Sequence, residues 1–363
     1  MKVVRARLLR YSVPFRQPYT TAHGTALARD GFLVEIGTSD GVTGLGEASL
    51  LPGDDPDANG FADAVEACVR AALGREVDDL ASPLWHASEG AAVEIAAWDA
   101  LARAAGKPMA QYFGGGSLLD VPVNALVTAL SPEVVYTQAA AAKAAGYTTV
   151  KLKVGVCDTS KQEVERVMAA RSALGPDLAL RLDANGAWSE EEAFNIVKTF
   201  APYNPEYLEQ PVAPGNVEAL RQIRDSTRIP IAADEDASTV GAALAVINAG
   251  AADVLVLKPL QLGGITACRR VIEAATRIGI DVTITTSIDS GVGTAAALHL
   301  AAALGGGDAA GLATLSMLES PLTTSELCIE RGRLLVPPGA GLGITLDEAA
   351  LARYVSAEAT FGV

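Results

Sequence analysis

The sequence predicts an α/β protein in which a barrel of parallel strands is covered by an α+β domain. From residue 121 onward, short apolar strands alternate with helices, a pattern that produces a parallel sheet. Eight strands at long, regular spacing favour a closed barrel, and no Gly-x-Gly-x-x-Gly follows the first strand to favour a dinucleotide fold. Both ends of the chain contain strands and turns instead. We therefore expect residues 1–120, completed by residues 325–363, to cap a barrel formed by residues 121–324.

The composition of the 363 residues indicates a large core and argues against polyanionic partners. Half of the residues are hydrophobic, and mean hydropathy is +0.26, yet no apolar run is long enough to cross a bilayer. The formal net charge of −15 disfavours nucleic acid and anionic membranes as partners. The four cysteines have no metal or redox spacing, and the N-terminus lacks the apolar segment of a secretory signal. We expect a reduced, cytoplasmic protein that acts on a small molecule, with a homo-oligomer left open.

The N-terminal segment is expected to form strands followed by helices. Strands are predicted over residues 3–9 and 31–36, and Asp40-Gly41 after the second strand is a hairpin signal. Residues 58–105 are rich in alanine and have a helical pattern, which ends at Gly106-Lys107-Pro108.

Two segments near these strands are predicted as loops. Residues 18–29 are polar and lack periodicity, so a mobile loop is expected there. Residues 50–56 read Leu-Leu-Pro-Gly-Asp-Asp-Pro and are expected to be irregular. Substrate specificity is expected to lie in these two loops, whose conformation the sequence leaves open.

The barrel is predicted as eight strands with helices between them. The strands are placed at residues 121–127, 149–154, 178–182, 207–209, 229–232, 254–257, 282–286 and 311–315. The helices are placed at residues 163–174, 190–200, 217–224, 240–249 and 265–278.

Charged residues stand at the ends of these strands. Lys151 and Lys153 are two apart, so in a strand they project from the same face. Four later apolar runs each end in a charged residue: Asp183, Glu209, Asp234 and Lys258. These residues are 26, 25 and 24 positions apart, close to one βα unit of roughly 30 residues. Equal spacing brings the strand ends to one rim, where barrel enzymes have their active sites.

The three acids are expected to hold a divalent cation. Like charges raise one another's pKa, and burial adds to the cost, whereas a cation removes the repulsion. Hard oxygen ligands suit Mg²⁺, with Mn²⁺ as a substitute. The alternative is that Asp183, Glu209 and Asp234 cap helices or form salt bridges with the lysines. For any one acid alone that alternative is preferred, but three acids at near-equal spacing favour the metal.

The neighbouring lysines are expected to move protons. Beside a cation, the pKa of a lysine falls toward the range in which the neutral amine is a general base. The cation then stabilises the enediolate formed when the proton next to a carboxylate is removed. Lys153 and Lys258 are the expected pair, with Lys151 as the charge that keeps Lys153 partly neutral. Surface or packing roles are expected for the three histidines, which are His23, His86 and His299.

Five short motifs resemble the enolase superfamily, in its muconate-lactonizing subgroup. They are Lys-x-Lys at 151–153, Asp-Ala-Asn-Gly-Ala-Trp at 183–188, Glu-Gln-Pro at 209–211, Ala-Asp-Glu at 233–235 and Lys258-Pro259. The resemblance covers nearly the whole chain. It implies a modified (β/α)7β TIM barrel with an α+β capping domain formed from the N-terminal segment and the C-terminal tail. It also implies Mg²⁺ held by the three acids, with the two acting lysines on opposite faces of the substrate.

Within the subgroup, further motifs look like those of o-succinylbenzoate synthases. They are Arg29-Asp30-Gly31, Gly46-Glu47-Ala48 leading to Leu51-Pro52-Gly53, Leu262-Gly263-Gly264, residues 286–293 and residues 311–315. The resemblance implies a hydro-lyase of menaquinone biosynthesis that dehydrates a succinyl-hydroxycyclohexadiene carboxylate. By this resemblance Lys153 removes the proton and protonates the departing hydroxide, while Lys258 stabilises the enediolate. Substrate contacts are expected from Lys151, Asn185, Gly263, Thr286, Ser287 and Asp289.

Three other functions remain open. A dipeptide epimerase would use Lys153 and Lys258 as a two-base pair, but epimerases of this kind usually place Asp-x-Asp on the eighth strand to hold the substrate's ammonium. Here residues 313–316 read Ala-Thr-Leu-Ser, without an acid. An N-succinylamino acid racemase would use the same residues as the synthase. The non-enzyme alternative is a barrel that only binds a metal or a metabolite.

Overall fold

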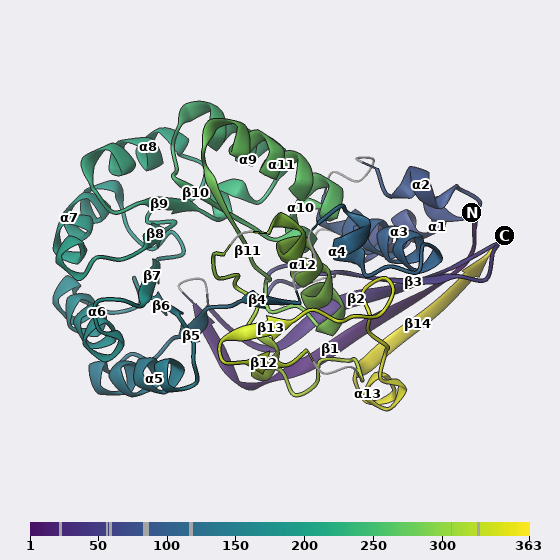
Figure 1. Cartoon of the computed structure of the whole chain (residues 1–363), viewed down its shortest axis with the longest axis horizontal. Helices are drawn as coiled ribbons and strands as arrows, with labels where there is room; N and C mark the ends of the chain where they lie inside the picture. Colours follow the sequence, from purple (N-terminus) through teal and green to yellow (C-terminus); the bar gives the residue numbers. More distant parts are fainter. Residues whose placement is uncertain are drawn as a thin grey trace.

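Seven parallel strands form a curled sheet in the order β11-β10-β9-β8-β7-β6-β5 (Figure 1). This computed structural model describes residues 1–21, 24–55, 57, 60–82, 87–115, 119–305, 307–324 and 327–363. The strands are β5 (Ala125–Val127), β6 (Thr149–Lys153), β7 (Ala179–Asp183), β8 (Tyr207–Glu209), β9 (Ile231–Ala233), β10 (Val254–Leu257) and β11 (Asp281–Ile284). Each strand pairs with the next one along the chain, as repeated strand–helix units require.

Helices cover the outer face of this sheet (Figure 1). They are α5 (Pro132–Ala144), α6 (Ser160–Leu174), α7 (Glu190–Phe200), α8 (Val217–Ser226), α9 (Val240–Ala249), α11 (Ile265–Ile278) and α12 (Gly291–Leu304). The short helix α10 (Pro259–Leu262) lies at the carboxyl end of β10 instead. Local sequence explains where several begin, because Thr159 and Ser189 each form a capping box with the residue three positions on. In the described ranges, no helix has the length and apolar character needed to cross a membrane.

Residues 310–311 close the barrel where an eighth strand was predicted. Ala310 bridges Val123 on one side and Gly311 bridges Thr285 on the other, each as an isolated pair. The predicted strand over 311–315 is therefore too long, because the chain turns away after this bridge into a 3₁₀ turn at Leu315–Met317. A Cβ on Gly311 would lie 2.2 Å from Oγ1 of Thr285, so the close approach requires glycine.

The bridge at Val123 also divides the first predicted barrel strand. Residues 121–127 form two short strands, β4 (Asp120–Pro122) and β5, instead of one. β4 leaves the barrel and pairs with the tail, in the three-stranded sheet β12-β13-β4. The tail strands are β12 (Ile329–Glu330) and β13 (Arg333–Leu335).

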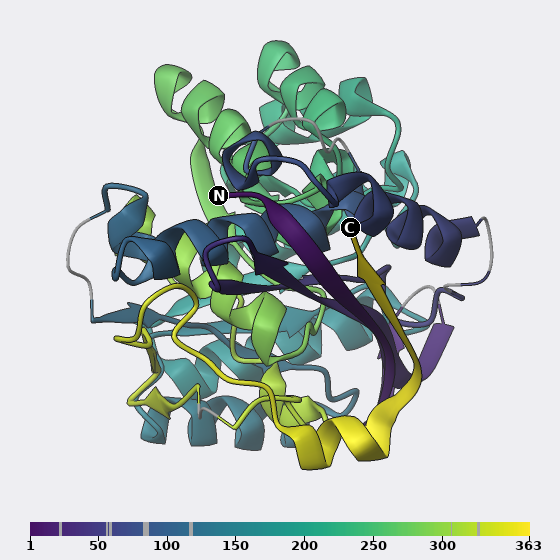
Figure 2. The ribbon, with the colours of Figure 1, turned by 90° about the vertical axis from the view of Figure 1, so that its right-hand side faces the viewer.

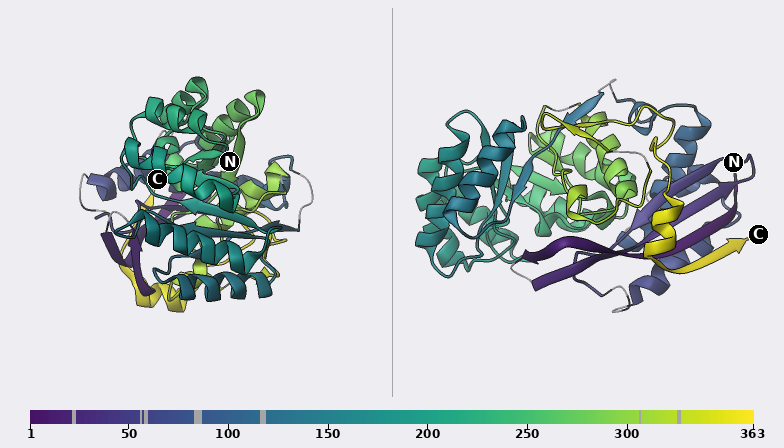
Figure 3. Two further views of the ribbon diagram at one scale, coloured as in Figure 1. Left: turned by 90° about the vertical axis from the view of Figure 1, so that its left-hand side faces the viewer. Right: turned by 90° about the horizontal axis from the view of Figure 1, so that it is seen from below.

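A second, antiparallel sheet in the order β14-β1-β2-β3 forms the cap (Figures 2 and 3). Its strands are β1 (Val3–Thr21), β2 (Gly24–Thr38), β3 (Thr43–Ala48) and β14 (Val355–Gly362), and the cap helices are α1 (Phe61–Ala72), α2 (Val77–Leu80), α3 (Ala91–Ala104) and α4 (Met109–Tyr112). The C-terminal strand follows α13 (Glu348–Tyr354) and pairs with the N-terminal one, so the two ends of the chain lie side by side (Figure 1). The tail thus completes the cap, as the sequence predicts.

The cap sheet contributes residues to two cores. Along β1, Ala6 and Leu8 pack in one core cluster with residues of α1 and α3. Leu9, Tyr11 and Val13 belong to the larger cluster that includes the barrel. Because adjacent strand residues point to opposite faces, one strand serves both cores and fixes the cap on the barrel.

The prediction of a mobile loop over residues 18–29 is wrong for the residues that the structure describes. Residues 18–21 continue β1 and residues 24–29 belong to β2, with Tyr19 opposite Ala26; residues 22 and 23 lie outside the description. Backbone pairing holds this extension of the hairpin. Leu27 in the same extension is 69% exposed. Because neither face of the extension is fully buried, apolar and polar residues do not alternate along it. The sequence pattern therefore does not indicate a strand there.

His299 on α12 has the packing role that the sequence suggested. Its Nδ1 accepts a hydrogen bond of 3.2 Å from the backbone N–H of Ala110, and its Nε2 lies 3.1 Å from the carbonyl oxygen of Leu342. Burial lowers the pKa of His299 to about 4, so the ring is neutral near pH 7. His23 and His86 lie outside the described residues.

Candidate active site

Lys151 and Lys153 project from β6 into the barrel. Val150 and Leu152, which alternate with them, are fully buried in the core. The two lysines therefore share a face, and both ammonium groups reach the carboxylate of Asp183 on the neighbouring strand.

Three carboxylates stand at the carboxyl ends of three adjacent strands. Asp183 and Glu209 are the last residues of β7 and β8 and face each other in register, and Asp234 directly follows β9. Their exposed fractions are 0%, 0% and 6%. Lys258 directly follows β10. The strand-end placement that the regular spacing predicted is confirmed, and it brings these charges to one rim.

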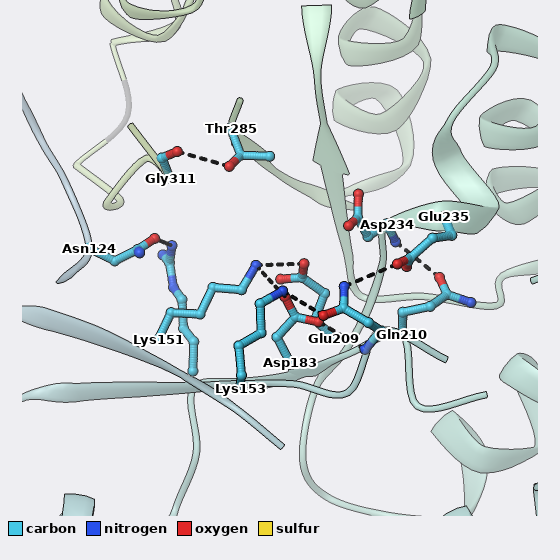
Figure 4. Close-up of polar contacts among 12 residues, drawn as sticks. Asn124, Lys151, Lys153, Asp183, Glu209, Gln210, Asp234, Glu235, Thr285 and Gly311 are labelled. Atoms are coloured by element: carbon cyan, nitrogen blue, oxygen red, sulfur yellow. Dashed lines mark hydrogen bonds and ion pairs between the residues drawn. The ribbon is translucent and has the colours of Figure 1, made fainter. Parts of the chain in front are cut away.

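Each of these carboxylates is ion-paired with a lysine, and Figure 4 shows the pairs that Lys151 and Lys153 form. Nζ of Lys151 lies 2.8 Å from Oδ2 of Asp183 and 2.6 Å from Oε1 of Glu209. Nζ of Lys153 lies 2.6 Å from the same Asp183 oxygen and 2.6 Å from Oδ1 of Asn185. Lys258 pairs with Asp234. The salt bridges considered as the alternative to a metal are therefore present.

These pairs set the direction of the lysine pKa values. Burial alone would lower the pKa of Lys153, but the carboxylate of Asp183 outweighs it and raises the pKa. Burial would likewise lower the pKa of Lys258, but the carboxylate of Asp234 outweighs it, so this pKa is raised as well. The lowering expected in the sequence analysis applies to a lysine beside a bound cation, whereas here a carboxylate is the direct partner of each lysine.

The residues at this rim fit a hard divalent cation by the type of their donor atoms and by their place at adjacent strand ends, but their side chains are turned to the lysines. Across the described ranges, no group of three or more Asp, Glu, His or Cys side chains is gathered closely enough to hold a metal ion. The acids bind lysine ammonium groups instead, yet Oε2 of Glu209 is buried without a hydrogen-bond partner among the described residues. Burial and the Asp183 carboxylate raise the pKa of Glu209 to about 8. Carboxylate oxygens from three neighbouring strands are the donors that Mg²⁺ prefers.

Gln210 fixes the backbone that carries Asp234. Oε1 of Gln210 accepts hydrogen bonds from the backbone N–H groups of Asp234 (3.1 Å) and Asp236 (3.3 Å). Its Nε2 donates to Oδ2 of Asp236 at 2.9 Å, and Oδ1 of Asp236 accepts from the backbone N–H of Gly215 at 2.7 Å. Gln210 has a φ of 39°, a conformation that side chains disfavour. No feature of the sequence analysis indicates this positioning role.

A cavity of about 390 Å³ opens over the charged rim. Its size is typical of a site for a small molecule. Lys153 and Lys258 line it from the barrel, and Tyr19, Leu51, Pro52 and Asp54 line it from the cap. Both segments in which substrate specificity was expected, 18–29 and 50–56, thus contribute residues to the cavity, and their role in specificity stays a prediction.

The structure brings most of the predicted contact residues to this cavity. Lys151, Asn185, Thr286 and Ser287 line it, and Oγ of Ser287 is buried without a hydrogen-bond partner among the described residues. Gly263 and Asp289 are not among the lining residues.

The two remaining predicted contact residues lie elsewhere. Gly263 ends α10 with a φ of 91°, and Asp289 is buried behind the cavity wall, paired with Arg29 at 3.3 Å.

The sequence analysis also missed Glu235, which lines the cavity beside Asp234 and has a buried, unpartnered Oε2 among the described residues. Its place in the Ala-Asp-Glu motif was the signal that could have found it.

Glu47 ties the cap to the barrel at the start of α12. Its carboxylate accepts hydrogen bonds from the Tyr11 hydroxyl (2.6 Å) and from the backbone N–H groups of Ser290 (3.0 Å) and Gly293 (2.8 Å). The Ser290 hydroxyl donates to it as well, at 2.5 Å. A carboxylate at a helix N-terminus is favoured by the unpaired N–H groups there.

Replacing Glu47 is therefore expected to destabilise the protein strongly. Glu47→Ala leaves several buried donors unpaired, each costing about 1–3 kcal/mol, and should lower the midpoint of thermal unfolding by about 5 °C or more. Differential scanning calorimetry measures this change. Glu358→Ala, which breaks the exposed pair with Arg7, is the control and should shift the midpoint by about 1 °C or less. Equal shifts for the two variants would contradict the role of Glu47.

The chain forms a closed barrel under an α+β cap, with acids and lysines at the strand ends. This arrangement defines a class of barrel enzyme whose site is lined by two domains. Two family comparisons place the chain within that class. Residues 4–114 match "Mandelate racemase / muconate lactonizing enzyme, N-terminal domain", and residues 134–350 match "Enolase C-terminal domain-like". The chain belongs to the enolase superfamily, as an enzyme of the muconate-lactonizing subgroup.

Individual relatives carry different activities. A hydrophobic dipeptide epimerase of Enterococcus faecalis is 30% identical and covers 95% of this chain and 100% of the relative. An o-succinylbenzoate synthase of Thermobifida fusca is 39% identical over 218 residues, which are 60% of this chain and 66% of the relative. A dipeptide epimerase of Cytophaga hutchinsonii, solved with Mg and D-Ala-L-Val, has a TM-score of 0.90 at 27% identity and covers 99% of this chain and 100% of that chain. The epimerases match more of the chain, and the synthase is more identical where it matches.

Proposed function

We propose that this enzyme removes a proton from the carbon next to a carboxylate, with Lys153 as the base and Lys258 on the opposite side. In the sheet order, β6 and β10 are separated by the three strands that end in acids, so the two lysines face each other across those strands. Their side chains are only 12% and 16% exposed, and both line the cavity. Proton transfer is favoured where the base is held beside the substrate and water is excluded.

The proposed cofactor is Mg²⁺, with Mn²⁺ as a substitute, held by Asp183, Glu209 and Asp234. The buried, unpartnered oxygen of Glu209 and the oxygen-only donor set support this proposal. The epimerase of Cytophaga hutchinsonii was solved with Mg. When bound, the cation supplies positive charge that stabilises the enediolate form of the substrate. Lys151, within 2.8 Å of two of the acids, holds them in place at the strand ends.

The proposed reaction is that of an o-succinylbenzoate synthase. The observation that supports this reaction is the set of side chains in the cavity wall at residues 313–314. Ala313 and Thr314 line the cavity there, and the Thr314 hydroxyl is hydrogen-bonded to that of Thr286 at 3.1 Å. This wall has no carboxylate to hold the ammonium of a dipeptide, whereas hydroxyl groups and the free Oγ of Ser287 suit the carboxylate oxygens of a succinyl group.

In this dehydration Lys153 acts twice. With a cation held by the acids, Asp183 would no longer raise the pKa of Lys153, and the neutral Nζ would take the proton from the ring carbon that carries the carboxylate. The electron pair of that C–H bond later forms the new ring double bond. The bond between the neighbouring carbon and its hydroxyl then breaks. The leaving hydroxide takes the proton back from the Lys153 ammonium and departs as water, which returns the lysine to its neutral form. Lys258, a cation in the opposite wall, favours the negative charge that develops between these two steps.

A dipeptide epimerase is the second candidate. The epimerases match nearly the whole chain, and Asp54 of the cap lines the cavity, where its carboxylate could hold a substrate ammonium. An N-succinylamino acid racemase shares the requirements of the synthase, because its substrate has no free ammonium and carries a succinyl carboxylate. Lys153 and Lys258 would then exchange the proton on opposite faces of one carbon.

A substrate panel separates these reactions. With Mg²⁺ present, we expect the absorbance of the cyclohexadiene substrate to fall with kcat/KM above about 10⁴ M⁻¹s⁻¹. Hydrophobic dipeptides and N-succinyl amino acids are followed in D₂O by the loss of their α-proton signals. Rapid exchange on dipeptides without dehydration would overturn the synthase assignment and leave proton abstraction intact. If Asp54→Asn then abolished that exchange, the ammonium contact of an epimerase would be located.

A further inference from the structure

Arg29 is a fully buried arginine that joins three separate segments of the chain. It lies on β2 of the cap and is 1% exposed. Its Nη1 donates to the carbonyl oxygen of Leu50 at 2.6 Å, and its Nε donates to that of Ile288 at 3.1 Å. Its Nη2 donates to the hydroxyl of Ser49 and lies 3.3 Å from Oδ1 of Asp289. One guanidinium therefore fixes a cap segment and a barrel segment to each other.

Both of these segments continue directly into the wall of the cavity. After Leu50, the residues Leu51, Pro52 and Asp54 line the cavity from the cap side. On the barrel side, Ser287 and Ile288 line it. A further contact strengthens the junction, since Nε2 of Gln261 donates to the carbonyl oxygen of Ser49 at 3.0 Å. Arg29 itself is not a lining residue, so it can act on a substrate only through these neighbours.

The backbone at Ile288 has a conformation that needs such a support. Its φ is 61°, which is a genuine outlier for a β-branched residue. Residues in disfavoured conformations persist only where surrounding contacts hold them, and they cluster at functional sites. The carbonyl of Ile288 is held by Arg29, and the next residue, Asp289, has Arg29 as its ionic partner. The same guanidinium thus holds the carbonyl group of the strained residue and the side chain of the residue that follows it.

We propose that Arg29 is a positioning residue that sets substrate affinity by fixing residues 49–54 against residues 287–289 over the reacting lysines. Its kinetic part rests on the proposed function, and its structural part does not. Loss of the guanidinium would let the cap segment and the Ser287–Ile288 wall move apart. Lys153 and Lys258 are held by their own strands, so substrate binding should weaken while the chemical step is retained.

Hydrogen–deuterium exchange measured by mass spectrometry tests the structural part without any substrate. In Arg29→Lys, which keeps the charge but not the fork of donors, we expect amide exchange in peptides covering 49–55 and 287–290 to rise about tenfold or more. Peptides of β6 and β8 should be unchanged. Arg171→Lys is the matched control, because the Arg171 guanidinium also binds backbone carbonyls, those of Tyr203, Gly175, Leu178 and Asn204, away from the cavity.

Steady-state kinetics test the affinity part. In Arg29→Lys, KM should rise about tenfold or more with kcat changed less than about threefold, and Arg171→Lys should keep both constants. A fall in kcat at unchanged KM would assign Arg29 a merely structural role and overturn the proposal. Equal exchange in wild type and variant at 49–55 would also overturn it.

Two milder variants keep the test decisive if Arg29→Lys does not fold. Ser49→Ala removes one acceptor of Arg29 and Asp289→Asn removes the charge of its ionic partner. Each should raise exchange in both segments together, because the guanidinium couples them. A rise confined to the mutated segment would refute the coupling. If no substrate is turned over by the wild type, the proposed function fails, while the exchange data still decide whether Arg29 joins the segments.

Discussion

Lys153→Ala is expected to lower the rate of proton abstraction by about 10³-fold or more, since a positioned base contributes about 10²–10⁴-fold and the same amine also returns the proton in the dehydration. The measurement is kcat for the dehydration, together with exchange of the substrate's α-proton in D₂O. The variant should fold, because Asp183 keeps the ammonium of Lys151 as a partner at 2.8 Å. The buried carboxylate is therefore not left without a counter-charge.

Lys143→Ala is the control for this experiment. The ammonium of Lys143 donates to the carbonyl oxygen of Leu174 and does not line the cavity, so the variant should keep wild-type rates. Normal activity in Lys153→Ala would exclude the proposed base. If the wild type also had no activity on any substrate of the panel, the protein would have to be regarded as a binding protein built on an enzyme fold.

Asp183→Asn is expected to abolish cation binding and, with it, activity. Loss of a residue that only supports a ligand weakens metal affinity about 10–100-fold, so loss of a ligand should weaken it about 100-fold or more. Titration with Mn²⁺ followed by electron paramagnetic resonance measures binding directly. Added Mg²⁺ should raise the midpoint of thermal unfolding of the wild type, because a ligand that binds only the folded state stabilises it, and should not raise that of the variant.

Asp177→Asn, an exposed residue just before β7, is the matched control and should bind Mn²⁺ as the wild type does. The fold of Asp183→Asn should persist, since the amide has the same shape and Lys151 keeps its bond to Glu209 at 2.6 Å. Equal Mn²⁺ affinity in wild type and Asp183→Asn would mean that the acids serve as salt-bridge partners of the lysines rather than as metal ligands. The proposed mechanism would then have no cation to stabilise the enediolate.

Much of the barrel could be predicted because its signals are local. The predicted strands at 207–209 and 254–257 agree with β8 and β10, and the helix predicted at 190–200 agrees with α7. Apolar runs, caps and the alternation of strand and helix each depend on a few neighbouring residues. The eighth strand was placed wrongly because its apolar residues, such as Leu312, are buried without belonging to a ladder.

The charged rim could be predicted for a related reason. Parallel strands joined by helices of similar length place their carboxyl ends at one rim, so equal spacing in sequence became proximity in space. The partners of these charges could not be read in the same way. That Lys153 contacts Asp183 and Asn185, and that Asp289 turns away from the cavity to Arg29, depends on how separate strands and the cap are placed.

By itself the sequence determined the class of fold, the order of strands and helices, and which acids and lysines stand at the strand ends. Each of these follows from short motifs and their spacing. Only the tertiary structure decided that residues 24–29 belong to a long hairpin, that the cap supplies Tyr19 and Asp54 to the cavity, and that Glu47 and Arg29 join cap to barrel. The physical reason is distance along the chain. Arg29 and Ile288 are 259 residues apart and Glu47 and Ser290 are 243 apart, so their contacts form only when two separately patterned domains pack together.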